Sequence, residues 1–138
     1  MIVAIRMAGR IGLPPQEEKI LYAIRLRKKY ACILLNDKEK QILEKVKNRI
    51  SFGEIDKETL RLLIAQRGRR PGNKPIKESS DLIAKKLEEE NKLNELGIKP
   101  FFSLNPPRGG FRRSTKSLYP RGILGENKNI NEILRRML

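Results

Sequence analysis

Apolar residues in the first 55 positions alternate between nearly continuous runs and runs with helical spacing. The nearly continuous runs, at 2–8, 31–35 and 50–55, are rich in Ile and other large apolar residues, which is typical of buried strands. Between them, apolar residues recur every three or four positions over 16–29 and 38–49, which predicts two amphipathic helices. Asn36 and Asp37 can cap the second helix, whose expected inward positions are Ile42, Leu43, Val46 and Ile50. We therefore expect the chain to begin with a strand-helix-strand-helix-strand unit.

The middle of the chain is predicted to add two helices. Asp56 is a favourable N-cap for the first. The second begins after Ser79 or Ser80, ends at Gly97 and contains many of the acidic residues. The apolar positions expected to face inward are Leu60, Leu63 and Ile64 in the first helix, and Leu82, Ile83, Leu87, Leu93 and Leu96 in the second.

The last third of the chain is predicted to contain a short strand at 101–104 and a helix at the end. The segment 105–128 is too rich in Pro, Gly and basic residues to bury its own backbone, so we expect an extended arm that becomes ordered on a partner. In the final helix, Asn129 and Glu132 form a capping-box-like pair. Its apolar stripe needs a covering surface and consists of Ile130, Ile133, Leu134 and Met137.

These elements suggest three parts in a chain of 138 residues. The first is an α+β core at 1–58. The second is a helical addition at 59–100, which contains a basic loop at 67–77. The third, at 101–138, joins the extended arm to the C-terminal helix. A chain of this length fits one compact domain with appendages.

The charge balance predicts a polyanionic partner. The chain has 31 Lys and Arg against 16 Asp and Glu, a formal charge of +15. Nucleic acid is the favoured partner for such a chain, because each cation that reaches a phosphate releases condensed counterions. Membrane binding would need a long apolar span or a basic amphipathic helix with large apolar anchors, and we find neither. The apolar N-terminus is short and is interrupted by Arg6 and Arg10, so we expect a cytosolic protein without a signal peptide.

The sequence offers no candidate for catalysis or metal binding. It has no histidine, and its one cysteine, Cys32, lies in an apolar run where a small core residue is expected. The consecutive acids Glu88, Glu89 and Glu90 point in different directions around a helix, so they cannot act as a paired acid and base. Neither glycine-rich stretch has the spacing of a phosphate-binding loop. We expect no enzyme activity, cofactor, metal or small-molecule substrate.

Basic residues at chain breaks and on the outer side of the first helix are the candidate RNA contacts. The segment 108–121 has five positive charges and no acid, and its interleaved aromatic residues can stack on bases. Arginine suits this role because its planar fork binds phosphate bidentately. The predicted RNA-binding residues are Arg6, Arg10, Arg25, Arg27, Lys28, Lys29, Arg67, Arg69, Arg70, Lys74, Arg108, Phe111, Arg112, Arg113, Lys116, Tyr119 and Arg121.

Three stretches in register resemble one known family. They are IRMAGRIG at 5–12 leading to IRLRKKYAC at 24–32, then FGEID at 52–56 with LIAQRGR at 63–69, then LNPPRGGF at 104–111. Together they resemble the archaeal-type form of large-subunit ribosomal protein L-thirty, whose eukaryotic relative is called L-seven. The resemblance covers nearly the whole chain. This sequence departs from many relatives at Tyr30-Ala31, where a polar pair often lies, and lacks the long basic N-terminal extension of the eukaryotic forms.

The resemblance implies a fold and a role. The implied fold is α+β, a two-layer sandwich whose strand-helix-strand-helix-strand core is similar to ferredoxin-like folds, with the helices on one face and with helical additions and a basic C-terminal arm. The implied sheet is antiparallel with the first strand central, whereas the helix crossovers alone predict parallel pairing of the first two strands. The implied partners are large-subunit ribosomal RNA and neighbouring ribosomal proteins, in a structural role within the cytoplasmic ribosome.

Two other functions fit the same charge. A free-standing DNA-binding or chromatin protein would normally show a recognition helix with exposed polar residues or a dimer seam, and we find neither clearly. A protein-interaction module could use the apolar stripe of the C-terminal helix together with the acidic helix. Gradient sedimentation separates the three functions, because the protein should travel with large subunits, with nucleoid DNA or with a smaller protein assembly.

Overall fold

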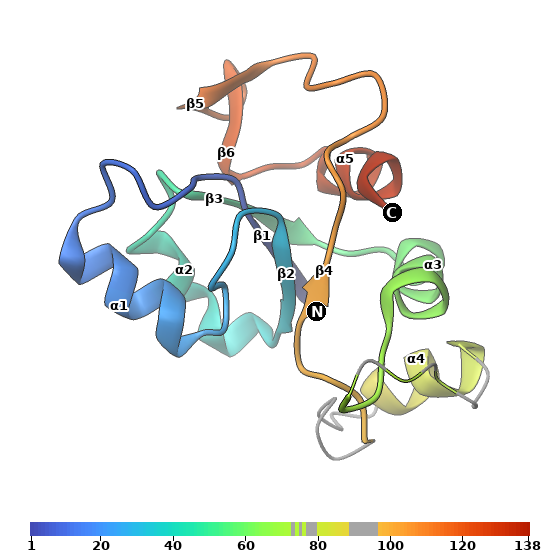
Figure 1. Cartoon of the computed structure of the whole chain (residues 1–138). Helices are drawn as coiled ribbons and strands as arrows, with labels where there is room; N and C mark the ends of the chain where they lie inside the picture. Colours follow the sequence, from blue (N-terminus) through green and yellow to red (C-terminus); the bar gives the residue numbers. More distant parts are fainter. Residues whose placement is uncertain (73, 75, 77–79, 89–96) are drawn as a thin grey trace.

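A six-stranded sheet with the order β4-β2-β1-β3-β6-β5 forms the centre of the protein (Figure 1). The computed structural model describes residues 1–72, 74, 76, 80–88 and 97–138. The strands are β1 (Ile2–Arg6), β2 (Ala31–Leu35), β3 (Ile50–Glu54), β4 (Phe102–Ser103), β5 (Ser114–Leu118) and β6 (Gly122–Glu126). The strands come from both ends of the chain, so the core and the C-terminal part share one sheet.

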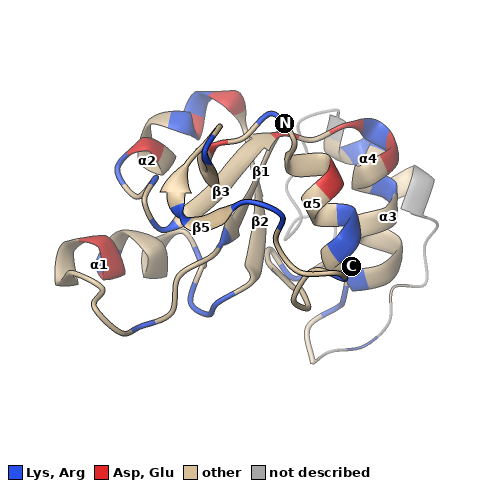
Figure 2. Ribbon diagram, turned by 90° about the horizontal axis from the view of Figure 1, so that it is seen from above, with Lys and Arg blue, Asp and Glu red and all other residues tan. Residues whose placement is uncertain are grey.

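Helices cover both faces of this sheet. They are α1 (Pro15–Ala23), the short 3₁₀ helix η1 (Asp37–Glu39), α2 (Lys40–Glu44), α3 (Lys57–Arg67), α4 (Ser80–Glu88) and α5 (Ile130–Met137). Helices α1 and α2 lie on one face, and α3, α4 and α5 lie on the other, as the two perpendicular views show (Figures 1 and 2). The α+β core is confirmed, with its two crossover helices on one face. The later helices add a third layer.

Strand β1 is the central strand of the first three. It pairs antiparallel with β2, where Ile5 lies opposite Cys32, and antiparallel with β3, where Arg6 lies opposite Ile50. The parallel pairing predicted from the helix crossovers is therefore wrong, and the sheet implied by the family resemblance is confirmed. The last residues of β2 and β3, Leu35 and Glu54, therefore lie beside Ile2, the first residue of β1.

All five residues of β1 are buried, because both faces of the sheet are covered. Ile2 and Ala4 pack with residues of α1 and α2, whereas Val3 and Ile5 pack with residues of α3, α4 and α5. Successive side chains of a strand point to opposite faces, so β1 contributes to two separate cores. This explains the nearly continuous apolar run in the sequence.

Helix α1 ends at Ala23, six residues before the predicted end. The amides of Arg25 and Leu26 donate to the carbonyls of Tyr22 and Leu21, at 3.1 and 2.9 Å, which is the hydrogen-bond pattern of a Schellman motif. Arg25 occupies the left-handed position that is usually glycine, with a φ of 69°. The prediction of a helix over 16–29 missed this end because no glycine marks it.

Helix α2 is also shorter than the predicted helix at 38–49. The segment divides into η1, α2 and turns, and the predicted capping residue Asn36 makes no side-chain hydrogen bond to the helix. Leu43 and Val46 are buried as expected, but Ile42 is 39% exposed. The predicted inward position of Ile42 is wrong, because a short helix turns only a narrow face toward the sheet.

Helix α3 follows its prediction closely. The Asp56 carboxylate accepts a 2.7 Å hydrogen bond from the Thr59 amide, and the predicted inward residues are buried. In α4, Ile83 and Leu87 are buried as predicted, whereas Leu82 is 45% exposed, which corrects its predicted inward position. The predicted cap at Ser79 and the packing positions Leu93 and Leu96 lie outside the described residues.

The segment 105–128 contains two strands, which corrects the prediction of an extended arm. β6 pairs parallel with β3, and its residues Ile123 and Leu124 are buried. β5 pairs with β6 in an irregular register and leaves most of its side chains exposed. Only about half of the segment, mainly 105–113, runs without regular pairing in this structure. The sheet supplies the hydrogen-bond partners that the sequence of β6 could not reveal.

The apolar stripe of α5 packs inside the protein. Its four predicted residues are at most 5% exposed and belong to the same core as residues of α3 and β6. Asn129 is the N-cap residue but makes no capping hydrogen bond, so the predicted pairing with Glu132 is wrong. The Asn129 amide, which Glu132 was predicted to accept from, donates instead to Asn127 Oδ1 at 2.8 Å.

Candidate nucleic-acid interface

A groove bordered by cations opens where the α1–β2 loop meets the segment around β4. Its volume is about 410 Å³. It contains four predicted RNA contacts of the α1–β2 loop and no acidic residue. The lining residues are Arg25, Arg27, Lys28, Lys29, Ala31, Pro100, Phe101, Ser103 and Leu104. The groove therefore combines an apolar lining with a positively charged edge.

The loop that carries the four cations is held from inside the protein. Leu26 is fully buried in the middle of the loop and packs in the core with Leu21. The Tyr30 amide donates to the Arg6 carbonyl at 2.7 Å, and the Leu104 amide donates to the Tyr30 carbonyl at 3.1 Å. Both borders of the groove are thus joined to the sheet.

Arg6 is part of this support and does not reach the surface. It is 3% exposed, and its Nε and Nη1 donate to the carbonyls of Ala8 and Leu26 at 2.8 and 2.9 Å. Burial lowers the pKa of Arg6, and repulsion from nearby Arg10 lowers it further. The structure contradicts the prediction that Arg6 contacts RNA, because its side chain is buried and its Nε and Nη1 donate inside the chain. Arg10, in contrast, is exposed.

The loop after α3 adjoins the groove. The Lys99 amide donates to the Arg69 carbonyl at 2.8 Å, which holds this loop beside the segment that leads into β4. Arg70 and Lys74 form an isolated bridge in which the Arg70 amide donates at 2.8 Å. Arg69 and Lys74 are exposed, whereas Arg67 and Arg70 are half-buried.

The segment after β4 extends the same surface in the other direction. Phe111 is half-buried against Tyr30, with ring centroids 6.3 Å apart, so its predicted stacking on a base is limited by this contact. Arg112 lies 3.6 Å from the Glu132 carboxylate, and the Arg113 guanidinium lies 5.5 Å from the centroid of the Tyr119 ring. These contacts orient the cations of the segment along the surface.

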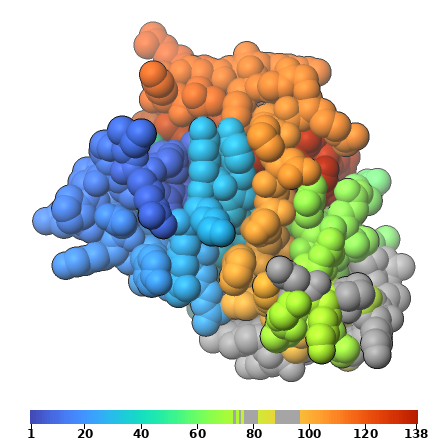
Figure 3. Space-filling model, in the orientation of Figure 1, coloured from blue at the N-terminus to red at the C-terminus, as the bar shows by residue number. Residues whose placement is uncertain are grey.

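Figure 3 shows the three segments on one face of the molecule, with the light-blue α1–β2 loop beside the orange chain around β4 and the yellow-green loop after α3. Of the predicted contacts, those exposed are Arg10, Arg25, Arg27, Lys28, Lys29, Arg69, Lys74, Arg108, Arg112, Arg113, Lys116 and Arg121; Arg67, Arg70, Phe111 and Tyr119 are half-buried. The fold thus gathers cations that are far apart in the sequence.

Sequence patterns did not indicate a role in this interface for Phe101, Lys99 or Ser103. Phe101 is 38% exposed and lines the groove, whereas its neighbour Phe102 is 1% exposed in the core. Successive residues of a strand face opposite sides, so the predicted strand at 101–104 already implied that one of the two rings points outward. The Lys99 ammonium lies 5.7 Å from the centroid of the Phe101 ring.

Acidic residues gather at the opposite end of the sheet. The amino group of Met1, at the start of β1, lies 3.0 Å from the Glu54 carboxylate and 3.6 Å from that of Asp37. Nearby, Lys40 pairs with Glu126 at 2.7 Å. Because β1 runs from this end to Arg6, the strand separates an acidic end from the basic groove.

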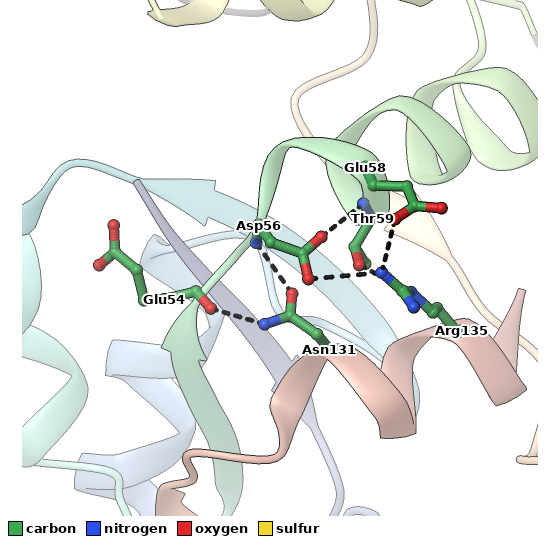
Figure 4. Close-up of polar contacts among 6 residues, drawn as sticks. All are labelled: Glu54, Asp56, Glu58, Thr59, Asn131 and Arg135. Atoms are coloured by element: carbon green, nitrogen blue, oxygen red, sulfur yellow. Dashed lines mark hydrogen bonds and ion pairs between the residues drawn. The ribbon is translucent and has the colours of Figure 1, made fainter.

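Polar contacts join α5 to this acidic end (Figure 4). The Asn131 side chain accepts from the Asp56 amide and donates to the Glu54 carbonyl, both at 3.0 Å. Arg135 donates to the Thr59 hydroxyl at 3.0 Å and lies 3.4 Å from the Asp56 carboxylate. Helix α5 is therefore tied to the α3 cap through Asn131 and Arg135.

Within the described ranges, the structure contains neither a cluster of metal-ligating side chains nor a membrane-spanning helix. No group of three Cys, Asp or Glu side chains in this part of the chain could hold a metal ion. No helix in the described ranges is both long enough and apolar enough to cross a membrane. Cys32 is fully buried, and burial raises the pKa of its thiol, as expected of a core residue.

Sequence comparisons identify the relatives of this chain. No family model matches it. A large ribosomal subunit protein uL30 from Staphylothermus marinus is 39% identical, and the matched region covers 97% of this chain and 96% of the relative. The uL30 proteins of Cenarchaeum symbiosum and Aeropyrum pernix are 35% and 34% identical, with 99% and 100% of this chain and 97% and 99% of the relatives covered.

The chain belongs to the uL30 family. These uL30 relatives match the chain along nearly its whole length, so the groove, the loop after α3 and the segment 105–128 all lie within the shared region. The uL30 family is one of ribosomal proteins and not of enzymes.

Proposed function

We propose that this uL30 protein is a structural constituent of the large ribosomal subunit that binds ribosomal RNA through its basic end, in the cytoplasmic ribosome. The observation that carries the proposal is the groove, whose lining contains four cations and no carboxylate. Membership of the uL30 family supports the ribosomal setting. The adjoining loops extend the cationic surface on both sides of the groove.

The chemistry of the interface is suited to phosphate. Arg25 and Arg27 can present planar forks to phosphate oxygens, while Lys28 and Lys29 act as point charges. These contacts position an RNA without reading its sequence. The exposed edge strand β5 adds Lys116 and the nearby Arg121 to the same class of contact. Neighbouring ribosomal proteins can then contact the remaining surface of the chain.

The separation of charge predicts an orientation. The carboxylates of Asp37, Glu54 and Glu126 lie at the end of the sheet away from the groove, where they would repel phosphates least when the groove faces RNA. The protein should therefore sit with its acidic end away from the ribosomal RNA, in reach of basic segments of neighbouring proteins.

Directed hydroxyl-radical cleavage tests this orientation. An iron chelate is attached to a cysteine introduced by Lys28→Cys at the groove or, as the matched control, by Lys38→Cys at the acidic end, both of which are exposed positions. Buried Cys32 does not compete for the reagent, because its thiol is inaccessible and its pKa is raised by burial. We expect strong cleavage of large-subunit RNA from position 28 and weak cleavage from position 38. Equal cleavage, or none, would contradict the proposed interface.

The salt dependence of binding measures the electrostatic contribution to the affinity for RNA. If about ten phosphates are neutralised, the logarithm of the association constant should fall with the logarithm of salt concentration with a slope of about −7 to −9. A slope near zero would reject phosphate contacts as the source of affinity. Cosedimentation with large subunits rather than with nucleoid DNA distinguishes the proposal from a DNA-binding function.

A protein-interaction module based on the α5 stripe is disfavoured by the structure. Ile130 and Met137, at the two ends of the stripe, are fully buried in the core of the chain itself. A partner would have to displace that core to reach them.

A further inference from the structure

We propose that the groove receives a single unpaired nucleotide of the ribosomal RNA, with its base against Phe101 and its phosphate among the cations of the α1–β2 loop. This inference rests on the proposed function, and it adds that the site takes a nucleotide extruded from its helix rather than the backbone of an intact duplex.

The size and lining of the groove fit a base with its sugar. Its volume of about 410 Å³ falls within the range of about 300–1,000 Å³ that is typical of small-molecule sites. Its lining includes Ala31, Pro100 and Leu104, which suit an apolar base face, and Ser103, which supplies a hydroxyl for a base edge. A flat phosphate-binding surface needs neither an apolar lining nor a hollow of this volume.

Phe101 is the exposed aromatic residue of this site. It is 38% exposed, whereas Phe102 is in the core and Phe111 packs on Tyr30. An exposed Phe ring has no hydrogen-bonding group of its own, and its exposure to water is unfavourable unless a partner covers it. A stacked base is such a partner, since every base presents a π face.

The cations at the edge are held in place before RNA arrives. Arg25 and Tyr30 have φ angles of 69° and 67°, in the left-handed region that residues other than Gly rarely adopt. Arg25 is held by the Schellman hydrogen bonds beside buried Leu26, and Tyr30 is held by backbone hydrogen bonds to Arg6 and Leu104. Strain of this kind persists where the surroundings over-determine the backbone, and it is concentrated at binding sites. Pre-organisation reduces the ordering cost of binding.

The geometry favours an unpaired nucleotide over a duplex. In an A-form helix the base faces are stacked on one another and the major groove is too narrow for side chains. Only a nucleotide outside the stack can place its base on Phe101 while its phosphate lies beside Arg27 or Lys28. Specific recognition of RNA commonly uses such splayed bases on aromatic side chains.

Photocrosslinking tests the inference on the full chain bound to large-subunit ribosomal RNA of the same organism. Phe101 is replaced by p-benzoylphenylalanine, the crosslinked nucleotide is mapped by reverse transcription, and its pairing is determined by chemical probing of 2′-hydroxyl reactivity. Ile42, which is 39% exposed on α2 and lies outside the proposed interface, receives the same replacement as the matched control. We expect a crosslink from position 101 to one unpaired nucleotide.

The affinity of Phe101→Ala for the same RNA provides the second measurement. Loss of one stacked base should weaken binding by about 5- to 150-fold, whereas Ile42→Ala on α2 should leave it unchanged. Both positions are exposed, so urea denaturation should show that both variants fold as the unaltered chain does.

The outcomes separate the inference from the proposed function. A crosslink to an unpaired nucleotide together with weaker binding of Phe101→Ala supports the inference. RNA binding with a crosslink only to paired nucleotides, or with full affinity in Phe101→Ala, overturns the nucleotide site and leaves the proposed function standing. Absence of RNA binding by the unaltered chain overturns both.

Discussion

The guanidinium of Arg6 donates a 2.9 Å hydrogen bond from Nη1 to the carbonyl oxygen of Leu26, a residue twenty positions later. Both residues are buried. The bond ties the α1–β2 loop to the central strand, so a charge inside the protein determines where the charges at its surface lie. Arg6 contributes to the basic groove as a positioning residue, without touching a partner.

Replacement of Arg6 by methionine should destabilise the protein. Arg6→Met keeps much of the side-chain volume but leaves the Leu26 and Ala8 carbonyls without their donor, at a cost of about 1–3 kcal/mol for each buried group left unsatisfied. Urea denaturation measures the loss in the free energy of unfolding. The matched variant Arg10→Met, at an exposed position, should change it by less than about 0.5 kcal/mol. Equal stability of the two variants would contradict the structural role of Arg6.

Acid should weaken the cap of α3. Burial by itself raises the pKa of Asp56, but hydrogen bonds from Thr59 and the charge of Arg135 more than offset this, and the net pKa is lowered below the ordinary 3.8. A carboxylate whose pKa is lower in the folded chain stabilises fully above its unfolded pKa, and this contribution disappears as pH falls through the folded pKa.

The variants at this position separate capping from charge. At neutral pH, Asp56→Ala should lower the free energy of unfolding by about 0.5–2 kcal/mol, and the deficit should shrink below pH 3.8. Asp56→Asn keeps an N-cap acceptor but cannot ionise, so its own cap should not respond to acid. Urea titrations across this pH range measure both. A deficit of Asp56→Ala that stays constant with pH would show that the charge is irrelevant.

Gly53 should tolerate no side chain. A Cβ at this position would lie 2.5 Å from the Asn127 carbonyl oxygen and 2.9 Å from a methyl group of Ile130. Gly53→Ala must therefore push α5 away from β3, with an expected loss of about 1–3 kcal/mol. Gly9→Ala, where a Cβ would meet nothing within 4 Å, is the control in the same thermal or urea melt. The prediction fails if both substitutions are neutral.

The α5 stripe should stabilise the isolated chain. Leu134→Ala removes a fully buried side chain, and such truncations cost about 2–5 kcal/mol. The measurement is urea denaturation of the purified protein without partners. Leu118→Ala, at an exposed position, should have little effect. A Leu134→Ala chain as stable as the unaltered one would indicate that the stripe serves a partner instead of the core.

Local sequence signals predicted the elements that carry a clear apolar run or capping residue of their own. The apolar runs at 31–35 and 50–55 became β2 and β3, and Asp56 became the cap of α3. Prediction failed where distant segments decide. The sequence of β6 contains two glycines and looks irregular, yet the open edge of β3 supplies its hydrogen-bond partners. The α1 end was missed because its Schellman motif carries Arg25 in place of glycine.

The sequence by itself determined the net charge of +15, the positions of the chain breaks that carry it and the apolar periodicities of the core. Only the tertiary structure decided which cations face outward. Arg6 and Arg27 have the same side chain, but one lies inside beside a carbonyl and the other borders the groove. The physical reason is that exposure and pairing depend on contacts between residues far apart in the chain. The groove itself arises because antiparallel pairing brings β4 beside β2.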